Sequence, residues 1–153
     1  MNIEIERKYL LKGPPKFPKP TATLEIDQGY IPGEKLIERL RRQRDANGVT
    51  RYFRTVKTGS GVSRTELEDE TDARTFDHLW KLTEGRRLRK RRYVVLNGDD
   101  MWEIDEFTDR PLWLAELELD HADTPVTIPD WLEPVLVRDV TDEPAYSNHS
   151  LAR

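Results

Sequence analysis

The stretch IEIERKYL, Ile3 to Leu10, decides how the fold of this chain is interpreted. At the two-residue period of a β-strand, Glu4, Glu6 and Lys8 fall on one face and the residues between them on the other. Successive members of this charged set then lie about 7 Å apart. Such a face either lies in water or forms one wall of a site for a metal ion and an anion.

The composition predicts one cytoplasmic domain. The 153 residues suit a single domain, 1–153, with enough length to bury a core. Cysteine is absent, which excludes disulfides and thiolate metal sites and favours a reducing compartment. Only three histidines are present, which disfavours a histidine-rich zinc site. With no run of 18 apolar residues and no basic leader before an apolar stretch, we expect neither a membrane span nor a signal peptide.

The charges are numerous but segregated along the chain. Lysine and arginine number 25 against 29 acidic residues, for a net charge of −4, which argues against a general nucleic-acid binder. Segments 39–44 (RLRRQR) and 86–92 (RRLRKRR) are basic, whereas 66–70 (ELEDE) and 116–120 (ELELD) are acidic. This separation indicates that some charged faces have partners other than water.

Turn residues divide the chain into short segments that predict eight antiparallel strands, at 2–11, 23–31, 35–43, 49–58, 62–70, 87–96, 101–107 and 112–120. One helix is predicted between an N-cap at Asp72 and a stop at Gly85, with short helical turns after Pro129 and near 147–152. Eight such strands can close around one small ligand. The predicted class is therefore α+β, mainly β: an eight-stranded antiparallel barrel, or tunnel, with a polar, charged lumen and a few flanking helices.

Alternation leaves two explanations for the charged faces. A one-sided sheet with its polar face in water accounts for most strands taken singly. It fails for 87–93, where Lys90 and Arg92 share one face and three further arginines occupy the other. Such a strand fits a barrel wall between solvent and a polar lumen, although a basic helix and an edge segment remain as rivals.

A polar lumen would hold opposite charges that compensate one another. Its cations would be Lys8, Arg39, Arg41, Lys57, Lys90 and Arg92. Its acids would be Glu4, Glu6, Glu66, Glu68, Asp105, Glu116 and Glu118. Clustered cations suit a chain of phosphates, and carboxylates suit a hard divalent ion such as Mg²⁺ or Mn²⁺. Phosphate and carboxylate oxygens around one metal are typical of phosphoryl transfer.

The stretch EIERKYL near the start of the chain resembles the ExExK signature of the CYTH superfamily, the triphosphate tunnel metalloenzymes. Further blocks resemble that family in its order: DQGYI, ERLRRQ, YFRTVKTGSGVSRTELE, TEGRRLRKRRY, WEIDEF, LAELEL and VTDEPAYSNHSLA. The resemblance covers nearly the whole chain and is greatest to the small bacterial inorganic triphosphatases. Ala145 departs from the family, because a basic residue is expected before YSN, and this puts the closing role of the tail in doubt.

The resemblance implies a tunnel that binds one or two Mg²⁺ or Mn²⁺ ions and a triphosphate. By position, the phosphate-binding residues would be Lys8, Arg39, Arg41, Lys57, Lys90 and Arg92. The metal ligands would be Glu4, Glu6, Glu116 and Glu118, with Glu66, Glu68 and Asp105 as supporting acids. Tyr30 resembles a tyrosine that some members pair with the lysine at position 57, near the chemistry.

The function expected is metal-dependent hydrolysis of inorganic triphosphate to diphosphate and phosphate. Alternatives are hydrolysis of thiamine triphosphate or a nucleoside triphosphate, a class IV adenylyl cyclase, and a non-catalytic polyphosphate-binding module. The attacking water would be activated by a carboxylate, a second metal, or Tyr30 with Lys57, the last only if a cation lowered the tyrosine pKa. We expect a small-molecule triphosphate as partner, no nucleic acid or membrane, and allow for a homodimer.

Other conspicuous residues have structural explanations. Phe76, Leu79 and Trp80 recur at helical spacing and are expected to pack in a core. The remaining tryptophans are expected to pack rather than to stack on bases: Trp102, Trp113 and Trp131. Surface positions are expected for the histidines (His78, His121 and His149) and for the arginines on the second face of their strand (Arg87, Arg89 and Arg91).

Overall fold

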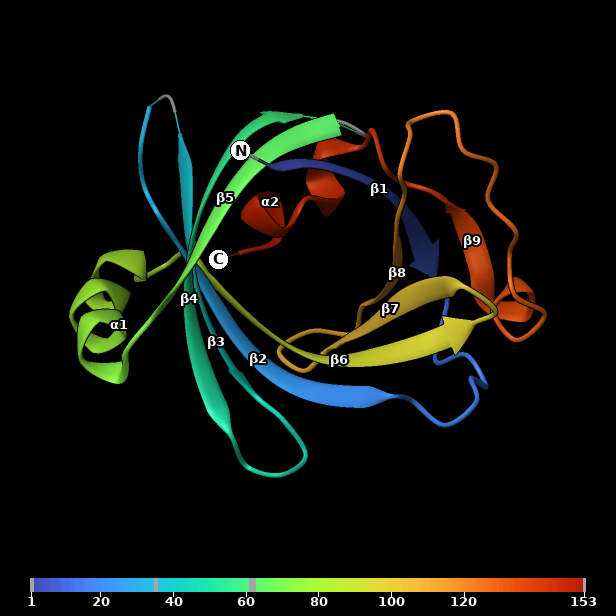
Figure 1. Ribbon diagram of the computed structural model, residues 1–153, viewed down its shortest axis with the longest axis horizontal. Coiled ribbons are helices and arrows are strands. Elements are labelled where there is room, and N and C mark those ends of the chain that lie inside the picture. The colour runs from blue at the N-terminus through green and yellow to red at the C-terminus, as the bar shows by residue number, and fades with distance from the viewer. Residues whose placement is uncertain (1, 35, 61–62, 153) are drawn as a thin grey trace.

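The computed structural model describes residues 2–34, 36–60 and 63–152 (Figure 1). Its strands are β1 (Asn2–Leu11), β2 (Ala22–Ile31), β3 (Ile37–Arg44), β4 (Thr50–Ser60), β5 (Ser63–Thr71), β6 (Arg87–Asn97), β7 (Asp100–Phe107), β8 (Trp113–Glu118) and β9 (Leu136–Asp139). Its helices are α1 (Ala73–Trp80) and α2 (Asn148–Leu151), with 3-10 turns η1 (Lys81–Thr83), η2 (Glu133–Val135) and η3 (Pro144–Tyr146). Each predicted strand is present, but the expected strand starts at Lys35 and Val62 lie outside the described residues.

The described strands form one antiparallel sheet in the order β5-β4-β3-β2-β6-β7-β8-β1-β9. β1 pairs with β5 along Asn2 to Ile5, and with β8 and β9 along its second half. The mainly β antiparallel class is therefore confirmed, whereas the expected total of eight strands is wrong. β9 escaped detection because four residues are too few to display a period of two.

The register places the predicted site residues opposite one another. Directly paired residues of neighbouring antiparallel strands share a face of the sheet. The pairs include Lys8 with Glu116, Arg39 with Thr55, Lys57 with Glu66, and Arg92 with Asp105. Alternation along single strands had grouped these residues correctly, and we call this face the inner face.

The opposite, outer face carries an apolar core over β1, β6, β7 and β8. Tyr9, Val95, Trp102 and Ala115 are buried there, and the segment between β8 and β9 covers them, with Leu132 fully buried. The three tryptophans outside the helix belong to this cluster, so their expected packing role is confirmed. The core thus lies on the outside of the curved sheet, which leaves the inner face to the charged residues.

The outer arginines of β6 have ion pairs rather than water alone. Arg89 lies 2.9 Å from Asp27 of β2, and Arg91 pairs with Glu25 of the same strand. Arg87 differs, because it bonds to Thr83 and to the carbonyl of Trp80 and stacks over the Trp80 ring. This explains why β6 carries charge on both faces. Its inner face points toward the charged inner side of the sheet, and the arginines of its outer face contact acidic residues of β2 and the end of helix α1.

Helix α1 covers the outer face of β2 to β4, where it lies to the outside of the sheet in Figure 1. Asp72 is its N-cap and accepts from Thr75 N at 2.7 Å, as predicted. Phe76 is fully buried, and Gly29 of β2 leaves room for Trp80 and Thr83. Among the described residues, no helix has both the length and the apolar character needed to cross a membrane.

The C-terminal tail enters the curve of the sheet. Figure 1 shows α2 within the curve of the sheet, and Val140 and Ala152 pack with inner-face residues such as Tyr30, Leu88 and Phe107. An apolar layer therefore fills one end of the inner face. The charged residues occupy the part of that face that this layer leaves open.

Candidate active site

Most of the predicted site residues line one cavity of about 200 Å³ on the inner face. Nine of the predicted residues contribute: Glu4, Glu6, Arg39, Arg41, Lys57, Glu66, Glu68, Arg92 and Glu116. Seven strands supply the lining, so residues far apart in sequence converge only because the sheet is strongly curved.

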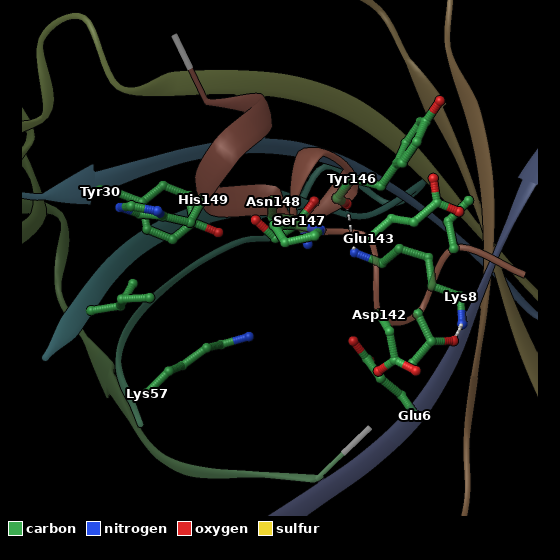
Figure 2. Close-up of a pocket in the computed structure, with 14 residues that line it drawn as sticks. Glu6, Lys8, Tyr30, Lys57, Asp142, Glu143, Tyr146, Ser147, Asn148 and His149 are labelled. Carbon is green, nitrogen blue, oxygen red and sulfur yellow. Dashed lines mark hydrogen bonds between the residues drawn. The ribbon is translucent and has the colours of Figure 1, made fainter. Parts of the chain in front are cut away.

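A second cavity of about 340 Å³ adjoins the first and shares Glu6, Lys57 and Asn148 with it. Lys8 and Tyr30 line this space, together with tail residues 140–144 and 146–149. In Figure 2, Lys57 reaches into the hollow from the lower left and Glu6 lies at its lower right, with the tail residues Ser147, Asn148 and His149 above them. His149 is exposed, as expected. Its ring also packs edge to face against the ring of Tyr30, with 5.2 Å between the two ring centroids.

Arg39 lines the first cavity and is held in place by residues of strands β4 and β5. Its Nη2 atom lies 3.1 Å from both Thr55 Oγ1 and Glu68 Oε2, and 3.7 Å from Glu66 Oε1. The Nε atom is buried and makes no hydrogen bond within the described part of the chain. A buried guanidinium with a donor to spare is suited to bind an oxyanion.

Arg92 joins three carboxylates across β6, β7 and β8. It bonds to Asp105 at 2.8 and 2.9 Å, to Glu103 at 3.0 Å, and lies 3.8 Å from Glu116. Burial opposes its charge, but these carboxylates prevail and hold the pKa of Arg92 well above its usual range. Arg92 is therefore a fixed positive charge in the cavity wall.

Lys57, which lines both cavities, and Lys8, which lines the second, make ion pairs at longer distances. Lys57 Nζ lies 3.6 Å from Glu66 and 3.9 Å from Glu4. Lys8 Nζ lies 3.5 Å from Glu116 Oε1 and donates to the carbonyl of Tyr146 at 3.1 Å. These long ion-pair distances leave room for a competing anion to attract either ammonium group.

Lys90 and Asp105 lie behind the cavity rather than on its surface. Both side chains are completely buried, with Lys90 Nζ 2.8 Å from Asp105 Oδ2. Burial lowers the pKa of Lys90 to about 8 despite the neighbouring carboxylate. The pKa of Asp105 is lowered, because Arg92 and Lys90 outweigh the cost of its burial. The structure thus gives Lys90 a supporting position, and its predicted phosphate contact stays a prediction.

The acids fit a divalent cation by donor chemistry, although no ready-made cluster exists. Among residues 2–34, 36–60 and 63–152, no group of three or more Asp, Glu or His side chains is arranged to hold a metal. Glu118 lies outside both cavities and is largely exposed. The partial burial of its carboxyl group and the nearby carboxylates of Glu4, Glu103 and Asp120 nevertheless raise its pKa. A cation would relieve this repulsion.

Glu116 offers a further oxygen to a cation. Its Oε1 atom is buried and accepts no hydrogen bond from any described residue, with Lys8 Nζ 3.5 Å away. Burial notwithstanding, Lys8, Arg92 and Lys90 hold the pKa of Glu116 well below its usual range, so it is a carboxylate at neutral pH. An ionised, buried oxygen of this kind is a suitable metal ligand.

Among the described residues that line the first cavity, acidic side chains outnumber basic ones. Its four basic residues are Arg39, Arg41, Lys57 and Arg92. Its six acidic residues are Glu4, Glu6, Glu66, Glu68, Glu103 and Glu116. Divalent cations would offset these carboxylates when a polyanion enters.

Tyr30 is too weak an acid to activate water at neutral pH. Burial raises its pKa, and the opposing effects of Arg39, Gln28, Arg41 and Lys8 do not reverse the shift. Its hydroxyl accepts from Gln28 Nε2 at 2.8 Å, and Gln28 Oε1 in turn accepts from Arg41 Nε at 3.0 Å. Tyr30 could act as a base only if a cation lowered its pKa, and its pKa is raised instead.

Sequence reasoning missed several residues of the site. Gln28 is fully buried between Tyr30 and Arg41, and Glu103 shares Arg92 with Asp105. Both lie on inner faces that alternation identifies, so position along the strand could have found them. Asn148 and the rest of the tail carry no such signal, because they are not part of a strand.

Comparisons with known proteins identify the family of this chain. No family model matches the chain. An inorganic triphosphatase of Nitrosomonas europaea is 36% identical over 97% of this chain and 96% of its own length. The chain belongs to the inorganic triphosphatase family. A crystal structure of an inorganic triphosphatase superposes with a TM-score of 0.66 and 33% identity, covering 99% of this chain and 95% of that one.

More distant structures share the fold of this inorganic triphosphatase family member. A protein from Pyrococcus horikoshii OT3 has a TM-score of 0.56 at 21% identity, covering 86% of this chain and 82% of its own. At this identity the likeness concerns the arrangement of the strands alone.

Proposed function

We propose that this member of the CYTH superfamily is a divalent-metal-dependent enzyme that hydrolyses inorganic triphosphate to diphosphate and phosphate. The observation that carries the proposal is one cavity lined by four basic and six acidic side chains on the inner face of the sheet. The activity named for the Nitrosomonas europaea relative supports the same substrate.

The proposed container is a closed eight-stranded tunnel. Pairing of β1 with β5, in addition to β8, supports closure of strands β1 to β8 into one ring, with β9 as an addition at the rim. A ring of eight strands encloses space for one small ligand. The charged inner residues would then line its lumen.

The cations of the cavity would bind the phosphates. Arg39, Arg41 and Arg92 would present guanidinium groups to the phosphoryl oxygens, and Lys8 and Lys57 would act as point charges. The carboxylates that already contact Arg39 and Arg92 fix them before substrate arrives. Such preorganised charge stabilises the transition state of phosphoryl transfer more than the ground state.

The metal would be Mg²⁺ or Mn²⁺, held by Glu4, Glu6, Glu116 and Glu118. Glu66, Glu68 and Asp105 would serve as supporting acids, which the contacts of Glu68 and Asp105 with buried arginines favour. When bound, the ion would neutralise charge on the phosphoryl oxygens. The excess of acidic over basic side chains among the described lining residues supports entry of the substrate together with its cation.

The proton of the attacking water would pass to a carboxylate of the cavity. Tyr30 would not accept this proton, because its raised pKa keeps its hydroxyl protonated at neutral pH. It would instead orient Gln28, which holds Arg41 by a 3.0 Å hydrogen bond.

Phosphate release by the purified protein tests the proposal. Inorganic triphosphate, thiamine triphosphate and ATP would each be assayed with Mg²⁺, with Mn²⁺ and with excess EDTA. We expect release from inorganic triphosphate that requires the metal, with diphosphate as the second product. Release mainly from an organic triphosphate would reject the substrate, and binding without release would favour a polyphosphate-binding module.

A further inference from the structure

Asn148 occupies a position that its sequence does not reveal. It is the first residue of α2, on the tail, and it lines both cavities of the site. The other side chains that line the first cavity are all charged, so Asn148 is the neutral member among the described residues there. Figure 2 places it across the hollow from Lys57 and Glu6.

Lys90 determines which way the Asn148 amide faces. The Nζ atom of Lys90 lies 3.4 Å from Asn148 Oδ1. An ammonium group can only donate, so the side-chain oxygen of Asn148 must be the branch that faces Lys90. The NH₂ branch then points away from Lys90, which is completely buried, while Asn148 itself lines the cavity.

The tail holds Asn148 in this position through contacts on either side of it. Before it, Val140 N donates to Lys8 O at 2.8 Å, and Lys8 Nζ donates to Tyr146 O at 3.1 Å. Next to it, Ser147 caps α2 by accepting from Ser150 N at 3.1 Å. After it, Ala152 is buried against the inner face. A donor fixed this way loses little conformational freedom when it binds a ligand.

We propose that the side-chain NH₂ of Asn148 donates a hydrogen bond to a phosphate oxygen of the substrate, with Lys90 fixing its orientation. The inference rests on the proposed function and adds a neutral donor to the cationic set. Such a donor binds an oxyanion without needing a carboxylate of its own to balance its charge. It also gives the tail a part in substrate binding.

Two substitutions of Asn148 distinguish its role as a hydrogen-bond donor from a structural role in the tail. Asn148→Ala removes both the NH₂ donor and the oxygen that Lys90 contacts. Asn148→Asp keeps an oxygen for Lys90 but replaces the donor by a negative oxygen. Ser147→Asp is the matched control for charge, because it adds a carboxylate one residue away at an N-cap position that tolerates Asp. Asn47→Asp, in an exposed turn, controls for the substitution itself.

The binding readout is calorimetric titration with diphosphate in the presence of Mg²⁺, since the proposed reaction does not consume this product. We expect Asn148→Ala to weaken binding about tenfold, as for loss of one charge-assisted hydrogen bond, and Asn148→Asp to weaken it further. Ser147→Asp should weaken it less than Asn148→Asp, and Asn47→Asp should bind as the wild type does. Melting temperatures should stay close to the wild-type value.

Three results would overturn the inference: wild-type affinity in Asn148→Ala, equal losses in Asn148→Asp and Ser147→Asp, or no binding by the wild type. Turnover of inorganic triphosphate is measured separately. A wild type that binds diphosphate but releases no phosphate would refute the proposed function, while the comparison of variants would still decide the role of Asn148.

Discussion

Arg39 and Arg51 are both strand arginines paired with glutamates, but their surroundings differ. The Arg39 side chain is 4% exposed and contacts Glu66 and Glu68 inside the cavity, whereas that of Arg51 is 56% exposed and pairs with Glu70 at the surface. Electrostatic interactions are stronger in the buried surroundings of Arg39, whereas water screens the exposed ion pair of Arg51 with Glu70. The same two residue types therefore line a cavity in one place and form a solvent-exposed ion pair in the other.

Replacing Arg39 by alanine should reduce kcat/KM for inorganic triphosphate by about 10²-fold or more, the usual cost of losing one preorganised donor to a transition-state oxyanion. Arg51→Ala is the matched control and should leave turnover near wild type. Steady-state phosphate release, with thermal unfolding of both variants, makes the comparison. Unchanged turnover in a folded Arg39→Ala protein would remove Arg39 from the site.

At the scale of elements, the fit of α1 and η1 against β2 depends on one glycine. A Cβ added at Gly29 would lie 2.7 Å from Thr83 Cβ and 2.9 Å from Trp80 Cζ3, closer than real contacts allow. Gly29 pairs with Leu40 and Arg87 on the outer face, so this contact is separate from the cavity. Packing of the helix and lining of the cavity therefore involve opposite faces of β2.

Gly29→Ala should lower the free energy of unfolding by about 1–3 kcal/mol, the usual cost of overpacking. Activity per folded molecule should change little, because the inner face is untouched. Gly13→Ala is the control, since a Cβ there meets nothing within 4 Å. Urea unfolding and phosphate release measure the two quantities. Equal stability of the two variants would show that the helix yields easily.

For the whole molecule, the buried ion network couples stability to pH. The folded protein holds the pKa of Glu116 well below 4.5 and that of Asp105 below 3.8. In the unfolded chain both regain ordinary values, so between the folded and unfolded pKa values the unfolded state binds more protons. Their stabilising effect is complete above the unfolded pKa values and is lost as pH falls through the lower, folded ones.

The free energy of unfolding should therefore fall as pH is lowered below about 4.5, and Glu116→Gln should make this decline shallower. Glu70→Gln, which alters a half-exposed surface pair, should leave the slope unchanged. Urea unfolding at a series of pH values between about 7 and 3 compares the three proteins. Parallel curves for Glu116→Gln and wild type would contradict the coupling.

The sequence by itself determined the strands and the faces of their charged residues. A period of two is a local property of extended backbone, so Arg39 and Lys57 could be assigned to one face without knowledge of their neighbours. The order of the motif blocks further identified the family resemblance. Register then follows from the turns between strands, and the structure pairs Lys57 with Glu66 accordingly.

The tertiary structure alone decided which of those residues reach the cavity. Lys90 and Lys57 are alike in sequence, yet Lys90 is sealed behind Asp105 while Lys57 faces open space, because the tail fills only one end of the inner face. Tyr30 has a raised pKa for the same reason, burial by segments distant in sequence. Such burial and the place of Asn148 depend on long-range packing, which no local pattern encodes.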